Sequence, residues 1–384
     1  MRILVGNHHL QKTGGTENYT YTLAVELKRL GHDVEYFTFY KGEISNKLEQ
    51  KGIPYMSWQY YDLILANHTT VIEYLCRFGY IVQTCHGVLT ELEQPSPFAD
   101  RHVGISEEIK EYIKTKGYDA EIVLNGIDCE RFAPKRQLSP NLKCVLSLSQ
   151  SSELNEFIKD CCDELGIEFK SCNKFTDNVW EIEDKINEAD LVVGIGRSLY
   201  DAMACGRCVL SYDNRGLIGK AIGDGYITKD NIEKSIYHNF IGRGTNKTFN
   251  REEFIYELKK YNPADGNWAR EYALSYLNIQ NAVKKYLSLY EDYPNDVANF
   301  WYHKMQKFYD MRCGKIETER IIEEKDRIIE EKGKIINDIQ NSVEKYKQNL
   351  QRVSLKKKKY LKIIRMMGYS IILFVLMAVF MSVL

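Results

Sequence analysis

Residues 190–211 restrict the fold of this chain more than any other stretch, because they combine a buried strand, a glycine turn and a short helix. The apolar run Leu191–Val193 predicts the strand, Gly194 and Gly196 allow a tight turn, and Ser198 is a residue type that caps helices. Backbone N–H groups at such a turn converge on one point, where phosphate binds well. The stretch therefore predicts a βαβ unit of a parallel sheet, serving either as plain architecture or as a phosphate site.

The N-terminal residues show the same order of strand, loop, helix and strand. A strand is predicted at 2–5, a polar loop that contains Gly14 and Gly15 follows, and a helix leads to a second strand at 33–39. This is the first βαβ unit of a doubly wound domain, in which the two glycines would let a ligand approach the backbone. A G-x-G-x-x-G dinucleotide motif does not occur there.

Polar residues follow several further predicted strands. His68, His86 and Ser106 stand just past strand ends, and Asn125 lies in an Asn-Gly turn after another. The carboxyl ends of parallel strands face the ligand crevice, so these positions are candidates for a site, although each histidine could equally be a surface or hydrogen-bonded loop residue. The strands concerned are expected at 63–66, 81–84, 102–105 and 121–124.

The alternation of strands and helices restarts after a polar stretch at 134–140, which predicts a domain boundary. We expect two Rossmann-like domains, at 1–135 and 136–262, that face a cleft, followed by closing helices at 263–313. Within the last segment, one amphipathic helix is predicted over 268–290.

A heptad repeat begins near residue 315. Ile322, Ile329, Ile336, Val343 and Leu350 share one core position, and residues 339, 346 and 353 share the other. The repeat predicts a coiled coil at 314–354 and a homo-oligomer that assembles through residues 316–353. The alternative is a lone amphipathic helix that packs on the globular body.

The last segments predict a membrane anchor. A basic segment at 355–365 precedes residues 366–384, which carry no charge and would span about 28 Å as a helix. Because the basic side precedes the apolar run, we expect a single-pass C-terminal anchor with the globular body in the cytosol. The N-terminus leads directly into a strand without a signal peptide, and the ten cysteines show no disulfide spacing, which is also typical of a cytosolic chain.

Charge and cysteine spacing exclude other classes of function. The formal net charge of −1 provides no global field for nucleic acid, so no nucleic-acid partner is expected. Cys205 and Cys208 have the spacing of half a zinc or redox site, but no second pair stands at a useful distance. We therefore expect no metal.

Four ordered motifs point to a family. Residues 12–34, 103–107, 125–134 and 201–209 closely resemble the retaining GT-B glycosyltransferases of the "glycosyl transferases group 1" family, and the resemblance extends over roughly residues 1–290. It implies an N-terminal domain for the acceptor and a C-terminal domain for a UDP- or GDP-linked sugar. The donor is a substrate, and no further cofactor is implied.

The resemblance also assigns roles to residues. Gly14 and Gly15 match the loop that approaches the donor diphosphate, and His86 matches a histidine near the transferred sugar. Of the two acidic residues typical of the family, the one that holds the ribose aligns with Asp201, whereas the one that contacts the sugar aligns with Val193, which cannot form a hydrogen bond.

A second departure concerns the basic residues that the family places after the first strand of its C-terminal domain. Here residues 147–153 carry no basic side chain. Charge on a departing diphosphate needs stabilisation, and Arg197 is the candidate, unless it is a surface residue or pairs with Asp190 or Asp201. The expected catalytic residues are His86 and Arg197, and the expected donor-binding residues are Gly14, Gly15, Asn125, Gly194, Gly196, Arg197, Ser198 and Asp201.

These observations predict a membrane-anchored, cytosol-facing glycosyltransferase that transfers a hexose with retention of configuration to a lipid, glycan or protein acceptor. The alternative is a catalytically inactive, transferase-like scaffold or partner subunit tethered to a membrane, which the changes at Val193 and 147–153 favour.

Overall fold

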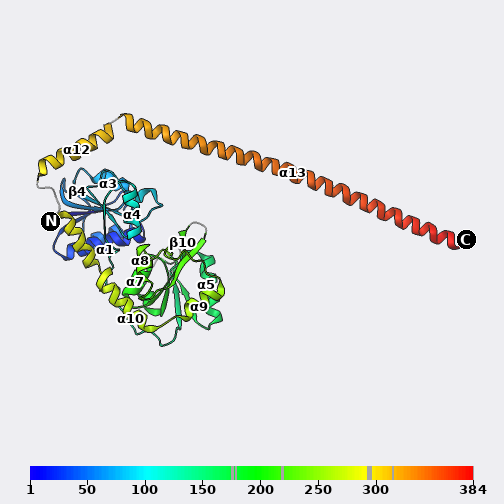
Figure 1. Cartoon of the computed structure of the whole chain (residues 1–384), viewed down its shortest axis with the longest axis horizontal. Coiled ribbons are helices and arrows are strands. Elements are labelled where there is room, and N and C mark those ends of the chain that lie inside the picture. The colour runs from blue at the N-terminus through cyan, green and yellow to red at the C-terminus, as the bar shows by residue number, and fades with distance from the viewer. Residues whose placement is uncertain (174–176, 178–179, 218–219, 292–295, 314, 384) are drawn as a thin grey trace. The chain divides into compact units, whose positions relative to one another are not determined.

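The computed structural model describes residues 1–384 except 174–176, 178–179, 218–219, 292–295, 314 and 384; side chains are also left undescribed at 216–217, 291, 311–323 and 370–383. The chain divides into two compact units, the globular unit Met1–Asp296 and the helical unit Val297–Leu384. Both are drawn in Figure 1.

The first domain of the globular unit is built on a parallel sheet of order β2-β1-β3-β4-β5-β6. Every residue of β4 is buried, because helices cover both faces of such a sheet. The strands are β1 Arg2–Gly6, β2 Asp33–Phe37, β3 Tyr61–Ala66, β4 Gly79–Cys85, β5 Arg101–Gly104 and β6 Ala120–Ile122. The helices are α1 Gly15–Arg29, α2 Glu43–Gln50, α3 Thr69–Leu75 and α4 Glu107–Thr115, with a 3₁₀ turn at Glu91–Glu93.

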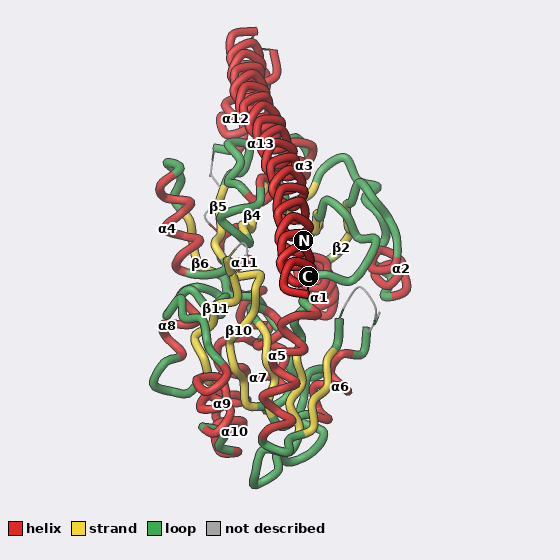
Figure 2. Tube along the Cα trace, turned by 90° about the vertical axis from the view of Figure 1, so that its right-hand side faces the viewer, coloured by secondary structure: helices red, strands yellow, loops and turns green. Residues whose placement is uncertain are grey.

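The second domain contains a sheet of order β11-β10-β9-β7-β8, in which only the β10–β11 pair is antiparallel among the described pairs. The strands are β7 Cys144–Ser147, β8 Glu168–Ser171, β9 Leu191–Gly194, β10 Cys208–Leu217 and β11 Lys220–Tyr226. The helices are α5 Ser152–Glu164, α6 Ile182–Glu188, α7 Arg197–Ala204, α8 Ile232–Tyr237 and α9 Arg251–Lys259. Figure 2 shows the strands and helices of both domains, and with their alternation along the chain and the parallel pairing of the strands the predicted α/β fold with parallel sheets is confirmed.

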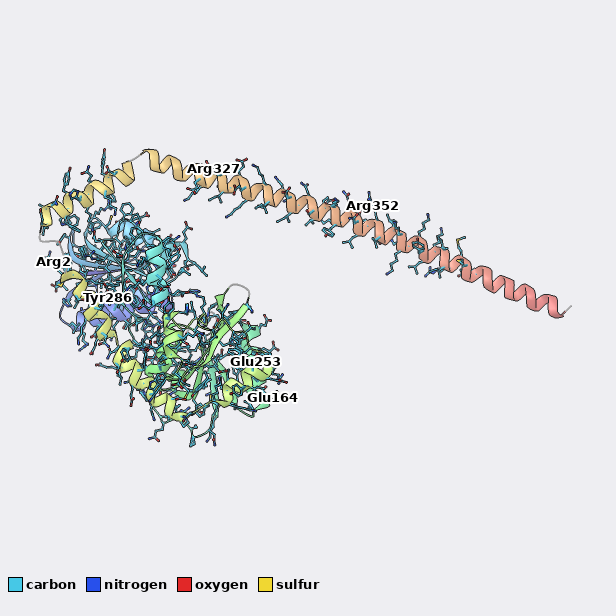
Figure 3. The ribbon with its side chains drawn as sticks, viewed as in Figure 1. Arg2, Glu164, Glu253, Tyr286, Arg327 and Arg352 are labelled. Carbon is cyan, nitrogen blue, oxygen red and sulfur yellow. The ribbon has the colours of Figure 1, made fainter. Side chains whose placement is uncertain are left out.

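The helices that follow the second domain return the chain to the first one. The single helix predicted at 268–290 is wrong: α10 Pro263–Tyr272 continues as a π-helical segment, Ala273–Leu277, and α11 Ile279–Glu291 starts after an extended Asn278. The helix breaks there because Ile127 accepts the backbone hydrogen bond of Ile279 and donates its own to Leu277. On α11, Tyr286 (Figure 3) forms hydrogen bonds with Tyr19 and Thr84 of the first domain.

The helical unit consists of α12 Val297–Cys313 and α13 Lys315–Val383. Along α13, the heptad side chains that the structure describes are exposed, for example Ile329 at 66% and Ile336 at 55%. Assembly into a coiled coil stays a prediction. In the described part of the chain, no helix combines the length and apolarity that crossing a bilayer requires. The predicted anchor 366–384 falls mainly on residues 370–384, whose side chains lie outside the described set.

Candidate active site

Two connected cavities lie between the domains of the globular unit. The first has a volume of about 280 Å³ and is lined by α1 and by the loops that follow β7, β8 and β9. The second, of about 1190 Å³, extends over the carboxyl ends of the strands of the first domain. Carboxyl ends of parallel strands are where α/β proteins bind ligands. Both cavities are lined by Thr13, Gly14, Gly15, Ile195, Arg197 and Arg215.

The glycine turn after β9 brings a helix start to the cleft. Gly196 has a φ of 56°, a left-handed conformation that favours glycine, and it is the N-cap of α7. The prediction that Ser198 caps this helix is wrong, because the N-cap is Gly196, two residues earlier, and the helix already begins at Arg197. Ser198 instead lines the first cavity.

In the other glycine loop, before α1, Gly14 and Gly15 differ in the space that surrounds them. A Cβ atom on Gly14 would lie 2.1 Å from Oε2 of Glu17, so the Glu17 side chain fills that space. A Cβ atom on Gly15 would have no protein atom within 4 Å. Because Gly15 lines both cavities, its backbone is open to a ligand.

Arg197 lies in the cleft between the two domains. Its Nη1 donates to the carbonyl of Gly126 and its Nη2 to Oγ1 of Thr22, each at 3.3 Å. Its Nε lies 3.7 Å from Oδ1 of Asp201, and both side chains are about one-tenth exposed. The salt bridge to Asp201 is therefore present, whereas Asp190 pairs with Arg136.

The surroundings of Asp201 are unfavourable for the negative charge of its carboxylate. Burial raises the pKa of its carboxyl from 3.8 to about 6, although the guanidinium groups of Arg197 and Arg131 act in the opposite direction. A carboxylate that stays buried next to a cavity at this cost is typical of a binding or catalytic site.

Several polar atoms at the first cavity have no hydrogen-bond partner. Among the described residues, they are Thr13 Oγ1, Asn18 Oδ1, Arg197 Nε and Asp201 Oδ1. Buried polar groups in folded proteins nearly always form hydrogen bonds, because an unmade bond costs about 1–3 kcal/mol. Thr13 and Asn18 belong to the first domain and Arg197 and Asp201 to the second, so the four atoms indicate a polar ligand between the domains, even though the Arg197 and Asp201 atoms also face each other at 3.7 Å.

His86 lines the second cavity as a neutral imidazole. Burial, assisted by His68 and Arg197, lowers its pKa to about 3. Its Nε2 lies 3.2 Å from Oδ1 of Asn67, and Asn67 Nδ2 donates to Thr20. Asn67 Oδ1 is thus an acceptor, which assigns the ring proton to Nε2 and makes Nδ1 an acceptor for a ligand hydroxyl.

The remaining predicted residues lie in different places. Asn125 lines the second cavity, with its Nδ2 3.5 Å from Oδ1 of Asn239. Gly194 ends β9 and lines neither cavity. Val193 is fully buried in the apolar core of the second domain, so its side chain cannot contact a sugar. Ser106 caps α4 by accepting from the backbone of Ile109.

Arg215 is a site residue that was not identified from the sequence. It stands on β10, yet its Nη2 donates to the carbonyl of Leu148 at 3.2 Å, in the loop that lacks basic residues. The buried carboxylate of Asp213 accepts from Nε at 2.9 Å and from Nη2 at 2.7 Å, which fixes the guanidinium at the edge of both cavities. No local signal identifies this residue, because it is distant in sequence from the loop it reaches.

An aromatic wall closes the first cavity. Tyr21 and Trp180 meet edge to face with ring centroids 5.0 Å apart, and the Arg131 guanidinium lies 4.7 Å from the Trp180 ring centroid. Arg131 is held by Glu183, with both hydrogen bonds at 2.9 Å. Tyr21 lies in the motif at 12–34 and Arg131 in the motif at 125–134, whereas Trp180 lies in none of the four motifs.

Comparison with solved structures reveals similarity to Anabaena HepE. The match to HepE in complex with UDP has 15% sequence identity, covers 75% of this chain and 99% of HepE, and has a TM-score of 0.51. HepE with UDP and glucose gives the same identity and coverage and a TM-score of 0.52. A glycosyltransferase from Rickettsia africae matches with 13% identity over 76% of this chain and 98% of its own, at a TM-score of 0.49.

Sequence comparisons find no counterpart: no protein-family model matches the chain, and neither does any curated protein. The likeness to HepE shows the fold of the globular unit, which is the GT-B arrangement of two Rossmann-like domains around a cleft. Membership of the group 1 family stays a prediction.

Proposed function

We propose that this protein is a glycosyltransferase that binds a nucleotide-linked sugar in the first cavity and transfers the sugar to an acceptor in the second. The unsatisfied polar atoms of the first cavity are the observation that carries the proposal, because a polar ligand between the two domains would satisfy them. UDP is the preferred nucleotide, since HepE, which has the same fold, was crystallised in complex with it.

Each part of the donor has matching chemistry in the cleft. The aromatic wall formed by Tyr21 and Trp180 suits a planar base, and the carboxylate of Asp201 suits the two ribose hydroxyls. Arg197, Arg215 and the start of α7 suit the diphosphate. The positive charge that residues 147–153 lack therefore comes from two arginines elsewhere in the sequence.

The charges also suggest how the reaction proceeds. As the bond between sugar and diphosphate breaks, negative charge develops on the departing phosphate, and Arg197 and Arg215 would stabilise it. His86, neutral with a proton on Nε2, would accept a hydrogen bond from a sugar or acceptor hydroxyl. With a pKa near 3, it does not deliver a proton at neutral pH.

Retention of anomeric configuration and transfer of a hexose are further parts of the proposal, taken from the resemblance to the group 1 family. The burial of Val193 favours a second candidate, an inactive transferase-like scaffold or partner subunit, because the acidic residue that contacts the sugar in that family has no replacement at this position. NMR analysis of the product anomer decides the stereochemistry, and hydrolysis of UDP-sugars by the full chain separates the enzyme from the scaffold.

We also propose that α13 oligomerises through residues 316–353 and that the basic segment 355–365 and the apolar segment 366–384 attach the protein to a membrane from the cytosolic side. Support comes from the heptad spacing, from the exposure of the described heptad side chains and from the uncharged C-terminal sequence.

Calorimetric titration of the full chain with UDP and GDP tests the donor site. We expect UDP to bind and Arg197→Ala to abolish or greatly weaken binding. Arg251→Ala is the matched control, because Arg251 is half-exposed on α9 and pairs with Glu164 away from both cavities. Unchanged UDP binding by the Arg197 variant would contradict the donor assignment.

A further inference from the structure

Two exposed aromatic rings, Phe39 and Tyr40, and the partly buried ring of His8 lie close in the chain to residues that line the second cavity. The ring of His8 lies 5.3 Å from that of Phe39 and 5.5 Å from that of Tyr40, measured between centroids. Phe39 is 43% exposed and Tyr40 is 53% exposed. We name these three residues, which follow the carboxyl ends of β1 and β2, the aromatic rim.

The aromatic rim is held in place by backbone hydrogen bonds. The N–H of Phe39 donates to the carbonyl of His8 at 3.1 Å, and the N–H of Leu10 donates to the carbonyl of Tyr40 at 2.9 Å. Nδ1 of His8 lies 2.8 Å from Oγ1 of Thr70. Phe39 also packs on Phe37 and Tyr74, with centroids 5.0 and 5.7 Å apart, yet much of its ring and of the Tyr40 ring stays in contact with water. Neighbouring apolar rings that remain exposed in this way are typical of a surface that binds a ligand.

The aromatic rim is joined to the second cavity through its neighbours in the chain. Lys41, directly after Tyr40, lines that cavity, and so does His9, directly after His8. His9 Nε2 lies 3.0 Å from Oε1 of Glu17, while its Nδ1 has no hydrogen-bond partner among the described residues. Further polar side chains in the lining are Gln11, His68, His86, Thr90 and Glu93.

This combination matches one class of ligand. A pyranose ring has an apolar face of C–H groups that packs on an aromatic ring, and a rim of hydroxyls that need donors and acceptors. A lipid chain would need a continuous apolar groove, whereas most of the residues that line this cavity carry polar side chains.

We propose that the acceptor is a saccharide and that one of its pyranose rings stacks on Tyr40 and Phe39, with the next sugar hydroxyls inside the second cavity. The inference rests on the proposed function and adds the chemical class of the acceptor. Lys41, the residue after Tyr40, lines the second cavity together with Gly15 and Arg197, which also line the first, so the saccharide would extend from the aromatic rim to the donor end.

A glycan array of defined neutral oligosaccharides, probed with the full chain at saturating UDP, tests the inference. We expect the chain to bind a subset of the array, Tyr40→Ala to weaken the affinity for a captured oligosaccharide about tenfold, and Tyr40→Phe to retain it. Tyr256→Ala, which removes a ring 64% exposed on α9, is the matched control and should bind as the wild type does.

Parallel calorimetry with UDP and GDP separates the two proposals. A wild type that binds neither UDP nor GDP would overturn the proposed function, whereas nucleotide binding without any bound glycan would overturn the saccharide acceptor alone. Equal glycan binding by Tyr40→Ala would also overturn it, and so would Tyr40-dependent binding to phosphatidylglycerol vesicles in place of glycans, because the aromatic rim would then contact a bilayer. Normal UDP binding by Tyr40→Ala shows that the variant is folded.

Discussion

Asp201 allows a test in which stability and binding move in opposite directions. We predict that Asp201→Asn makes the fold more stable at pH 8 and weakens UDP binding. Asparagine has nearly the shape of a protonated aspartate but carries no charge, so it removes the cost of burying a carboxylate. It also removes the charged acceptor that we assign to the ribose hydroxyls.

The magnitude follows from the raised pKa. The folded state holds the Asp201 proton up to about pH 6, whereas the unfolded chain holds it only up to about pH 3.8. The contribution of Asp201 to the free energy of unfolding is therefore highest below pH 3.8 and is lost as the pH rises through 6. Each pKa unit is worth about 1.4 kcal/mol, so the ionised carboxylate destabilises the fold by about 3 kcal/mol at pH 8. We therefore expect the free energy of unfolding of Asp201→Asn to exceed that of the wild type by about 3 kcal/mol at pH 8 and to differ from it hardly at all at pH 4.

Thermal unfolding of the full chain from pH 4 to 8 measures this difference, and at pH 8 the gain corresponds to a rise in melting temperature on the order of 5–10 °C. UDP affinity should fall about 10–100-fold, as expected for one lost hydrogen bond to a charged group. Lower stability of the variant at pH 8 would refute the reasoning, because the attraction between Asp201 and Arg197 would then outweigh the cost of burial.

Asp190 is the matched control in the same domain. Burial raises the pKa of its carboxyl, but hydrogen bonds from the backbone of Ser139 and from Arg136 outweigh that effect, so the pKa lies below its usual value. Its contribution to stability is present above the unfolded pKa and is lost as the pH falls. We expect Asp190→Asn to destabilise the fold at pH 8, with the opposite sign to Asp201→Asn.

Three further predictions test separate parts of the molecule. UDP affinity of the wild type should weaken below about pH 6, as Asp201 takes up its proton, and calorimetry should find this dependence absent from Asp201→Asn. Arg215→Ala should lower kcat for transfer about 10²–10³-fold, while Arg251→Ala changes it less than twofold; equal rates would exclude a role at the diphosphate. Ile336→Asp should shift the mass measured by light scattering toward the monomer, whereas Ile335→Asp, outside the heptad core, should not.

Local sequence patterns predict much of this protein. Apolar runs and glycine turns identify the strand-helix order of both domains, because burial on two faces of a parallel sheet leaves a signal within a few residues. The glycine turn at 194–196 and the presence of a helix after it are predicted for the same reason, although the helix begins earlier than the predicted Ser198 cap. Short motifs also bring Gly15, Arg197 and Asp201 into the expected group, and the structure places all three at the first cavity.

Long-range packing decides the rest. The helix predicted at 268–290 breaks because Ile127, far away in sequence, forms hydrogen bonds on both sides of Asn278, and periodicity carries no trace of such a partner. Arg215 reaches the loop after β7 only because β10 lies in the same sheet and Asp213 fixes its guanidinium.

The sequence by itself determined the element order, the parallel sheets and the main polar residues of the cleft, since each depends on neighbouring residues. Only the tertiary structure decided which of these residues share a cavity, that Val193 is sealed in the core, and that Asp201 is buried enough to raise its pKa to about 6. Desolvation and charge coupling depend on how segments distant in sequence pack together, and the order of residues does not encode that packing locally.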